Sequence, residues 1–401
     1  MVKKENKKEV AQPHETMARL MKQTKDDHFN FVKPVDYTIT SGSLNLDTAL
    51  DGGFGPGFHR FCGHNNSGKT ALALEVQANF IKYHKANNRD ARGLLIRAEG
   101  RLNQRAMERM NRDDIKYVTD PAEWEPWTVL IVNCQKYEVI ANYLVNLVRP
   151  NESETLFNVI IDSMDGLKLK SDEGKTYGET NKVAGAPAIS KRLLTDLSLE
   201  FNILGHQGIL ISQKTSAINI DPSKPSDVKD GNFSGGNALA HYANWILEFS
   251  KIFKSNIETE GDEKVNKVSR AADLKAHTCK ITIIKSMNET NYLTVEYLVK
   301  HRVVKGSSVW REQEIIDQLL LRDYIKASGA WITFPKSFVK ELKDKNLPFE
   351  EQFNGEKKLR DFLEENPALT NYLFNKFKNI MLLEKAIVDP DQETKAPEAK
   401  E

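Results

Sequence analysis

The residues from Gly63 to Thr70 read GHNNSGKT, which is the pattern G-x-x-x-x-G-K-T. An apolar run precedes this segment and a helical pattern follows it, which is the context that a phosphate-binding P-loop requires. Gly63 and Gly68 let the backbone turn tightly and direct its N–H groups at a polyphosphate, and the following helix adds the positive end of its dipole. We expect Lys69 to reach the β- and γ-phosphates and the Thr70 hydroxyl to hold Mg²⁺. The alternative is a chance glycine-rich turn.

Two carboxylates end apolar runs elsewhere in the chain. Asp162 ends FNVIID, where a Walker B carboxylate would organise Mg²⁺; the alternative is an aspartate that starts a turn. Glu99 ends LLIRAE, where it could polarise a water for attack on the γ-phosphate; the alternative is a cap on the next helix. The predicted site for ATP and Mg²⁺ comprises Gly63, His64, Asn65, Asn66, Ser67, Gly68, Lys69, Thr70, Ala71 and Asp162.

Gln213 ends the apolar run ILISQ in the same manner. A neutral amide can hydrogen-bond the γ-phosphate on one side and loop backbone on the other. We therefore expect Gln213 to report whether ATP or ADP is bound.

Composition sets few limits on function. The chain has 401 residues and a formal net charge of +1, which argues neither for nor against nucleic acid because a local basic groove can be masked elsewhere. Three cysteines, each in an apolar run, indicate reduced core residues. No run approaches the roughly 18 apolar residues of a membrane span. We expect no membrane partner and a cytoplasmic location.

Nearly continuous apolar runs alternate with helical patterns after the P-loop, which predicts a mostly parallel sheet covered by helices on both faces. Three later runs have little helix between them and are expected to continue the sheet in antiparallel fashion. The expected parallel strands are 93–98, 129–133, 157–162 and 208–212, and the expected antiparallel strands are 245–249, 279–285 and 292–298.

Residues 168–186 and 214–234 form long polar segments that follow predicted strands, on the side where open α/β sheets bind ligands. Loops of this length are functional or disordered, and we favour function. A third, highly charged segment at 255–275 is interpreted as a solvated hairpin tip. Near the N-terminus, a helix is predicted over 15–25 and a strand over 28–32 (HFNFV); this strand could pair with a neighbouring molecule or cover an edge of its own domain.

These motifs together resemble the RecA-type recombinases, including the UvsX-like members encoded by phages. The resemblance covers nearly the whole chain in the family's order. It rests on SGSLNLDTAL, GHNNSGKT, the AE at 98–99, VIIDS, the SQ at 212–213, SGGNALAHYA, IKASGAWITF and LRDFLEENPAL. The P-loop alone would indicate only an ATPase, whereas GSLNLD, GGNALAHYA and GAW are far more specific.

The resemblance implies a RecA-like P-loop NTPase core with a small α+β C-terminal domain. Glu99, Lys69 and Gln213 would be catalytic, together with Lys285, which resembles a lysine that reaches the γ-phosphate in the neighbouring subunit. The two long polar segments would be DNA-binding loops, and a helix opening behind the second would suit a DNA phosphate. The implied DNA-binding residues are Lys170, Lys175, Lys182, Lys214, Gly235, Gly236 and Asn237.

Some positions depart from the bacterial pattern. Met287 replaces a second lysine, and Ala240 and His241 replace a Lys-Phe pair that couples subunits. The residues that flank adenine have no clear equivalents, and Trp124 and Trp127 lie in a segment longer than its bacterial counterpart.

The predicted organisation is an oligomerisation segment (1–34), an ATPase core (35–304), a C-terminal domain (305–388) and a charged tail (389–401). The resemblance implies a helical filament that binds single- and double-stranded DNA, hydrolyses ATP and exchanges homologous strands, with single-strand-binding and mediator proteins as further partners. The alternatives are a hexameric helicase with the same core fold, against which GAW argues, and a DNA filament protein that binds ATP without hydrolysing it, against which Glu99 argues.

Overall fold

The computed structural model describes residues 13–25, 29–100, 115–149, 154–170, 185–214, 236–259, 274–303 and 306–388. Lys175, Lys182, Gly235 and the proposed charged tail lie outside these ranges, as does most of each predicted DNA-binding loop. Within the described ranges, no helix has the length and apolar content needed to cross a bilayer.

The main sheet has the strand order β10-β9-β7-β1-β6-β5-β2-β4-β3, and β8 pairs with β9 beside this path. The pairs from β7 through β1, β6, β5, β2 and β4 to β3 are all parallel. The strands are β1 (Gly57–Gly63), β2 (Ala91–Arg97), β3 (Lys116–Val118), β4 (Thr128–Asn133), β5 (Leu156–Asp162), β6 (Gln207–Gln213), β7 (Ala243–Phe249), β8 (Ile257–Thr259), β9 (Leu274–Lys285) and β10 (Thr294–Lys300).

The predicted parallel sheet is confirmed, with one correction that concerns the direction of β7. Strand β7 was expected to run antiparallel, but it lies parallel to β1, and the direction changes only at the pair of β7 with β9. The short helix α7 (Gly236–Tyr242) leads directly into β7, so the chain re-enters the sheet from the edge at which the parallel strands begin. Strands β9 and β10 are antiparallel as expected.

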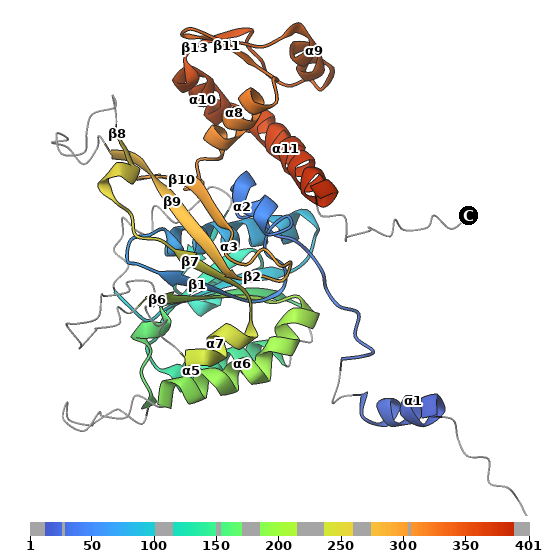
Figure 1. The fold of residues 1–401 in the computed structure, drawn as a ribbon. Coiled ribbons are helices and arrows are strands. Elements are labelled where there is room, and N and C mark those ends of the chain that lie inside the picture. The colour runs from blue at the N-terminus through green and yellow to red at the C-terminus, as the bar shows by residue number, and fades with distance from the viewer. Residues whose placement is uncertain are drawn as a thin grey trace, which may run out of the picture.

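Helices cover both faces of the sheet, α2 and α3 on one side and α5, α6 and α7 on the other (Figure 1). Successive strand residues enter different cores: Phe61 and Leu95 pack on the side of α3, while Phe58 and Leu94 pack on the side of α6. This alternation explains why the strands read as continuous apolar runs. These helices are α2 (Leu44–Ala49), α3 (Lys69–Ala86), α5 (Tyr137–Val148) and α6 (Gly185–Leu204), with α7.

Two tryptophans that the sequence left unexplained are structural. The Trp124 indole N–H donates to the carbonyl of Gly93 over 3.0 Å, and the Trp127 indole N–H donates to the carbonyl of Arg89 over 3.0 Å. Both rings therefore fix the approach to β4 against β2 and the end of α3, and bury apolar surface without leaving a polar group unpaired.

The C-terminal part has its own apolar cluster around Phe338, Leu359 and Phe377. It docks on α2 through Glu314, whose carboxylate accepts hydrogen bonds from the Ser43 hydroxyl and the Leu44 N–H, each over 2.7 Å. Its elements are α8 (Arg311–Leu321), β11 (Lys326–Ser328), β12 (Trp331–Thr333), α9 (Lys336–Asp344), β13 (Gln352–Asn354), α10 (Glu356–Glu365) and α11 (Pro367–Val388).

The N-terminal segment contains the predicted helix, α1 (Pro13–Gln23), which has no buried residue and lies apart from the core (Figure 1). The predicted strand is not formed in the single chain. Residues 29–32 make a turn instead, closed by the Val32 N–H to the Phe29 carbonyl over 3.0 Å, and His28 lies outside the described residues. A strand needs a neighbouring strand for its ladder of backbone hydrogen bonds, and none of the strands that the structure describes pairs with residues 29–32.

Candidate ATP site

The carboxyl ends of β1, β6, β5 and β2 meet at one edge of the sheet. Gly63 is in register with Gln213, and Arg97 is in register with Asp162. The P-loop and the predicted residues Glu99, Asp162 and Gln213 therefore all end at the same edge, as parallel strands require.

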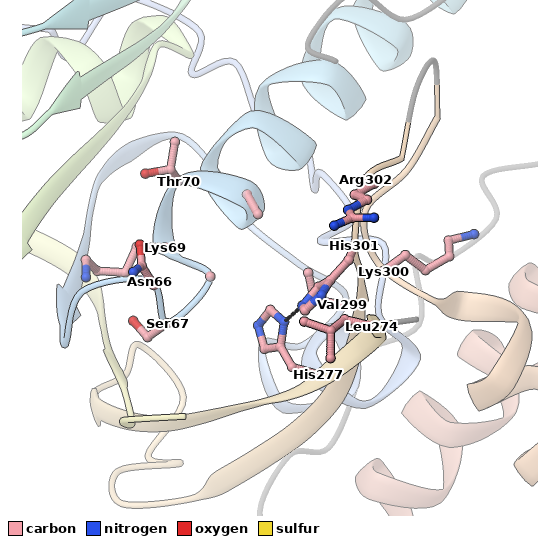
Figure 2. A pocket seen from close by; sticks show the side chains of 12 residues that line it. Asn66, Ser67, Lys69, Thr70, Leu274, His277, Val299, Lys300, His301 and Arg302 are labelled. Atoms are coloured by element: carbon pink, nitrogen blue, oxygen red, sulfur yellow. Dashed lines mark hydrogen bonds between the residues drawn. The ribbon is translucent and has the colours of Figure 1, made fainter. Parts of the chain in front are cut away.

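The P-loop requires glycine at the two predicted positions. Gly63 has φ +139°, and a Cβ there would stand 2.2 Å from the carbonyl oxygen of Phe249. Gly68 has φ +99°, and a Cβ there would stand 3.2 Å from the Cys279 sulfur. The loop thus packs directly on β7 and β9, and Lys69 opens α3 immediately after it (Figure 2).

Lys69 is buried, and its ammonium donates to the carbonyl oxygens of Gly63 over 3.0 Å and of His64 over 2.5 Å. Burial lowers the pKa of Lys69, while the nearby Asp162 carboxylate favours the charged form. The loop therefore holds its own lysine at the centre of its curve, where a phosphate chain would lie.

Thr70 and Asp162 form the predicted cation site. The Thr70 hydroxyl donates to the Asp162 carboxylate over 3.0 Å. Burial raises the pKa of Asp162, and the Thr70 hydrogen bond opposes that effect. The described residues hold no cluster of three or more His, Cys, Asp or Glu side chains that could bind a metal alone. This pair of hard oxygens fits Mg²⁺, which is commonly held by one or two protein oxygens together with phosphate oxygens and water.

Glu99 is half-buried at the end of β2 and is held from two sides. The Ser163 hydroxyl donates to one carboxylate oxygen over 2.7 Å, and the Gln213 amide donates to the other over 3.4 Å. A Cβ at Gly166 would stand 2.5 Å from Glu99 Cγ, so the turn after β5 packs on this side chain. The carboxylate is thus positioned next to Asp162 and Gln213. Residues 101–114, where the alternative interpretation placed a helix for Glu99 to cap, lie outside the described residues.

Sequence reasoning missed Ser163 and Asp165, which both follow β5. Ser163 orients Glu99, and the Asp165 carboxylate accepts the Gln213 backbone N–H over 2.7 Å. A signal was available, because Asp165 is a second carboxylate only three residues beyond Asp162 at the same strand end.

The remaining predicted residues have other contacts within one chain, and the backbone N–H of Lys214 donates to the carbonyl of Gly63 at the start of the P-loop over 3.2 Å. The Lys285 ammonium donates to the carbonyls of Ala240 and His241 over 3.0 and 2.8 Å, at the C-terminal end of α7.

The predicted DNA-binding residues have contacts of their own. The Lys214 ammonium forms an ion pair with the Glu248 carboxylate over 2.5 Å. The backbone N–H of Lys170 donates to the Glu138 carboxylate. Gly236 and Asn237 begin α7 as predicted. The DNA-binding and subunit-bridging roles of these residues stay predictions.

Comparison with known proteins is consistent with this geometry. No protein-family model matches the chain. Protein RecA of Bifidobacterium breve is 26% identical over 343 residues, which cover 85% of this chain and 73% of the relative. Protein RecA of Azoarcus sp. (strain BH72) is 26% identical over 361 residues, which cover 88% of this chain and 87% of the relative. The chain is related to the RecA-type recombinases. The crystal structure of the RadB recombinase aligns with a TM-score of 0.40 and 16% identity, covering 66% of this chain and 98% of that one.

The similarity to RecA and the mostly parallel sheet flanked by helices both fit the predicted fold class. The RecA-like core predicted from the motifs is confirmed.

Proposed function

We propose that this protein is an ATP-dependent DNA recombinase that polymerises on single-stranded DNA and exchanges strands with a homologous duplex. The observation that carries the proposal is the contact of Gln213 with Glu99 at the P-loop edge. It joins the predicted hydrolytic carboxylate to the residue from which the second predicted DNA-binding segment leaves the sheet. Its proposed location is the cytoplasm, where the DNA of a bacterium or phage is found.

The side chains divide the work of ATP hydrolysis. Lys69 and the P-loop N–H groups would bind and orient the phosphates, and Glu99 would accept the proton of the attacking water. When bound through Thr70 and Asp162, Mg²⁺ would supply neutralisation of phosphate charge. The Ser163 hydroxyl, which donates a hydrogen bond to Glu99, would keep this general base oriented toward the water.

Gln213 would transmit the state of this site to DNA. Its side chain contacts Glu99 and its backbone N–H is fixed by Asp165. The residues that follow it, 214–234, are the second proposed DNA-binding segment, while the first, 168–186, begins just beyond Asp165. Each proposed segment thus begins within a few residues of a group that contacts Glu99 or Gln213. A shift of Gln213 could therefore alter the positions of both segments together.

Polymerisation is proposed to use residues 1–34. Helix α1 buries no side chain in the single chain, and Phe31 and Val32 are 59% and 40% exposed. An amphipathic segment of this kind gains stability by docking on another surface. We propose that it docks on a neighbouring subunit, that residues 35–304 form the ATPase core and that residues 305–388 form the C-terminal domain.

Electron microscopy of the purified protein with ATP and single-stranded DNA tests this function. We expect helical filaments for the wild type and none for Lys69→Ala, because that variant lacks the ammonium that would hold the phosphates. A variant without residues 1–33 should remain folded yet monomeric. Closed rings, or no polymer at all from the wild type, would contradict the proposal.

A further inference from the structure

Arg60 is a buried cation in the middle of the main sheet. It lies on β1, between β7 and β6, and is 2% exposed. Burying a charged group is costly unless hydrogen bonds and opposite charge offset the loss of water. The partners of Arg60 therefore indicate which part of the fold it holds in place.

The Arg60 side chain reaches along the sheet toward the edge at which the ATP site lies. Arg60 is in register with Leu210 on β6, yet its Nε donates to the Ser212 hydroxyl, two residues farther along that strand, over 3.1 Å. Ser212 is fully buried and immediately precedes Gln213. Arg60 therefore fixes the last buried residue before the amide that contacts Glu99.

The charge of Arg60 acts on Gln213 by a second route. Burial lowers the pKa of Arg60, while Cys62 and Asp165 act in the opposite direction. A guanidinium stays protonated in proteins, so Arg60 is a cation that attracts the Asp165 carboxylate. That carboxylate accepts the Gln213 backbone N–H over 2.7 Å. Arg60 thus influences both the residue before Gln213 and the group that binds its N–H.

The chain is also anchored on the other side of Gln213. The Lys214 backbone N–H donates to the Gly63 carbonyl over 3.2 Å, and the Lys214 ammonium pairs with Glu248 over 2.5 Å. The backbone is therefore held one residue before and one residue after Gln213. The proposed DNA-binding segment 214–234 begins at the second anchor, so a displacement of that segment by DNA would act on a residue with a defined starting position.

The location of Arg60 excludes a direct role at either ligand. A side chain that is 2% exposed has no access to a DNA phosphate. Arg60 lies two residues beyond Phe58 and so on the face of the sheet that α6 covers, whereas the P-loop leads into α3 on the opposite face. Arg60 can therefore affect hydrolysis only through the residues that it positions.

We propose that Arg60 is a positioning residue that couples DNA binding to ATP hydrolysis. By fixing Ser212 and attracting Asp165, it keeps Gln213 placed against the proposed general base. This inference rests on the proposed function, because it needs an ATPase that responds to DNA. Since Arg60 takes no part in the chemistry, it governs the response to DNA and not the basal rate.

Steady-state ATP hydrolysis by the full-length protein, with and without single-stranded DNA, tests the assignment. Arg60→Met is the main variant, because replacement of a buried charge by an apolar side chain of similar length is often tolerated. Ser212→Ala removes only the hydroxyl that Arg60 contacts, and it carries the test if Arg60→Met does not fold. Arg92→Met is the matched control, because it removes an arginine from the start of β2, at the opposite end of the strand from the ATP site.

We expect the ratio of the rates with and without DNA to fall about tenfold in Arg60→Met, the equivalent of one charge-assisted hydrogen bond, and to fall in Ser212→Ala as well. The basal rate and the KM for ATP should be unchanged in both variants, and Arg92→Met should match the wild type throughout.

An undiminished response to DNA in Arg60→Met would overturn the assignment. So would an equal fall of the basal and stimulated rates, because Arg60 would then only stabilise the fold. A wild type whose hydrolysis does not respond to DNA would instead contradict the proposed function itself, and the assignment with it.

Discussion

The side-chain amide of Gln213 donates a hydrogen bond to the carboxylate of Glu99 across 3.4 Å. Gln213 ends β6 and Glu99 lies two residues beyond β2, and these two strands are separated in the sheet by β5. The turn after β5 bridges them, because Ser163 donates to Glu99 and Asp165 accepts the Gln213 backbone N–H. Three strand ends therefore form one hydrogen-bonded unit beside the P-loop.

This unit predicts that Gln213→Ala uncouples DNA from hydrolysis. The substitution removes the amide that contacts Glu99 but leaves the backbone N–H to Asp165 intact, so the strand end should keep its place. We expect the rate without DNA to be retained and its stimulation by single-stranded DNA to be lost. Steady-state hydrolysis with and without DNA measures this, and undiminished stimulation would show that Gln213 transmits nothing.

Glu99→Gln should abolish hydrolysis while preserving ATP binding. The amide matches the carboxylate in size and can still accept the Ser163 hydrogen bond, but it cannot take a proton from water. We expect turnover to fall by about 100-fold or more, the usual range for loss of a general base. Single-turnover kinetics beside an ATP titration separate the two effects. Turnover near the wild-type rate would assign the base to another residue.

Glu314→Ala should weaken the joint between α2 and the C-terminal part. It leaves the buried Ser43 hydroxyl and Leu44 N–H without their acceptor, which costs about 2–4 kcal/mol in unfolding free energy for two such groups. Chemical denaturation monitors the change, and Glu365→Ala, at an exposed position on α10, is the control. Equal stability of the two variants would mean that Glu314 is not a structural joint.

Acid should destabilise the fold through its buried histidines. Burial lowers the pKa of His206 to about 4, against an ordinary value of 6.5. Between these values the unfolded chain binds the proton and the folded chain does not, so stability is full above pH 6.5 and falls as the pH drops toward 4. Relative to His206→Asn, the wild type should lose about 2 kcal/mol between pH 7 and pH 5. A stability difference that does not vary with pH would contradict this.

The parallel core could be read from the sequence because strands buried on both faces leave continuous apolar runs, as in 157–162. The direction of β7 could not be predicted from the sequence, since an apolar run such as 245–249 does not indicate which strand it will pair with. HFNFV alternates like a strand, yet alternation does not supply the partner that a strand needs.

At the site, the sequence identified the residues that end strands but not those that hold them in place. Glu99, Asp162 and Gln213 stand out because they close apolar runs. Ser163 and Asp165 lie in an ordinary-looking turn, and only the fold of β5 beside β2 and β6 brings them to Glu99 and Gln213. The hydrogen bond between His277 and His301 was hidden for the same reason, since β9 and β10 bring together two rings that are separated in the sequence.

A strand-exchange reaction tests most directly whether this ATP site drives recombination. Purified protein, ATP and Mg²⁺ are mixed with single-stranded DNA and a labelled duplex of matching sequence, with a duplex of unrelated sequence and Lys69→Ala as controls. We predict transfer of the labelled strand only with the homologous duplex, ATP and wild-type protein. Absence of transfer from the homologous duplex, in a preparation that hydrolyses ATP in response to DNA, would contradict the proposed function.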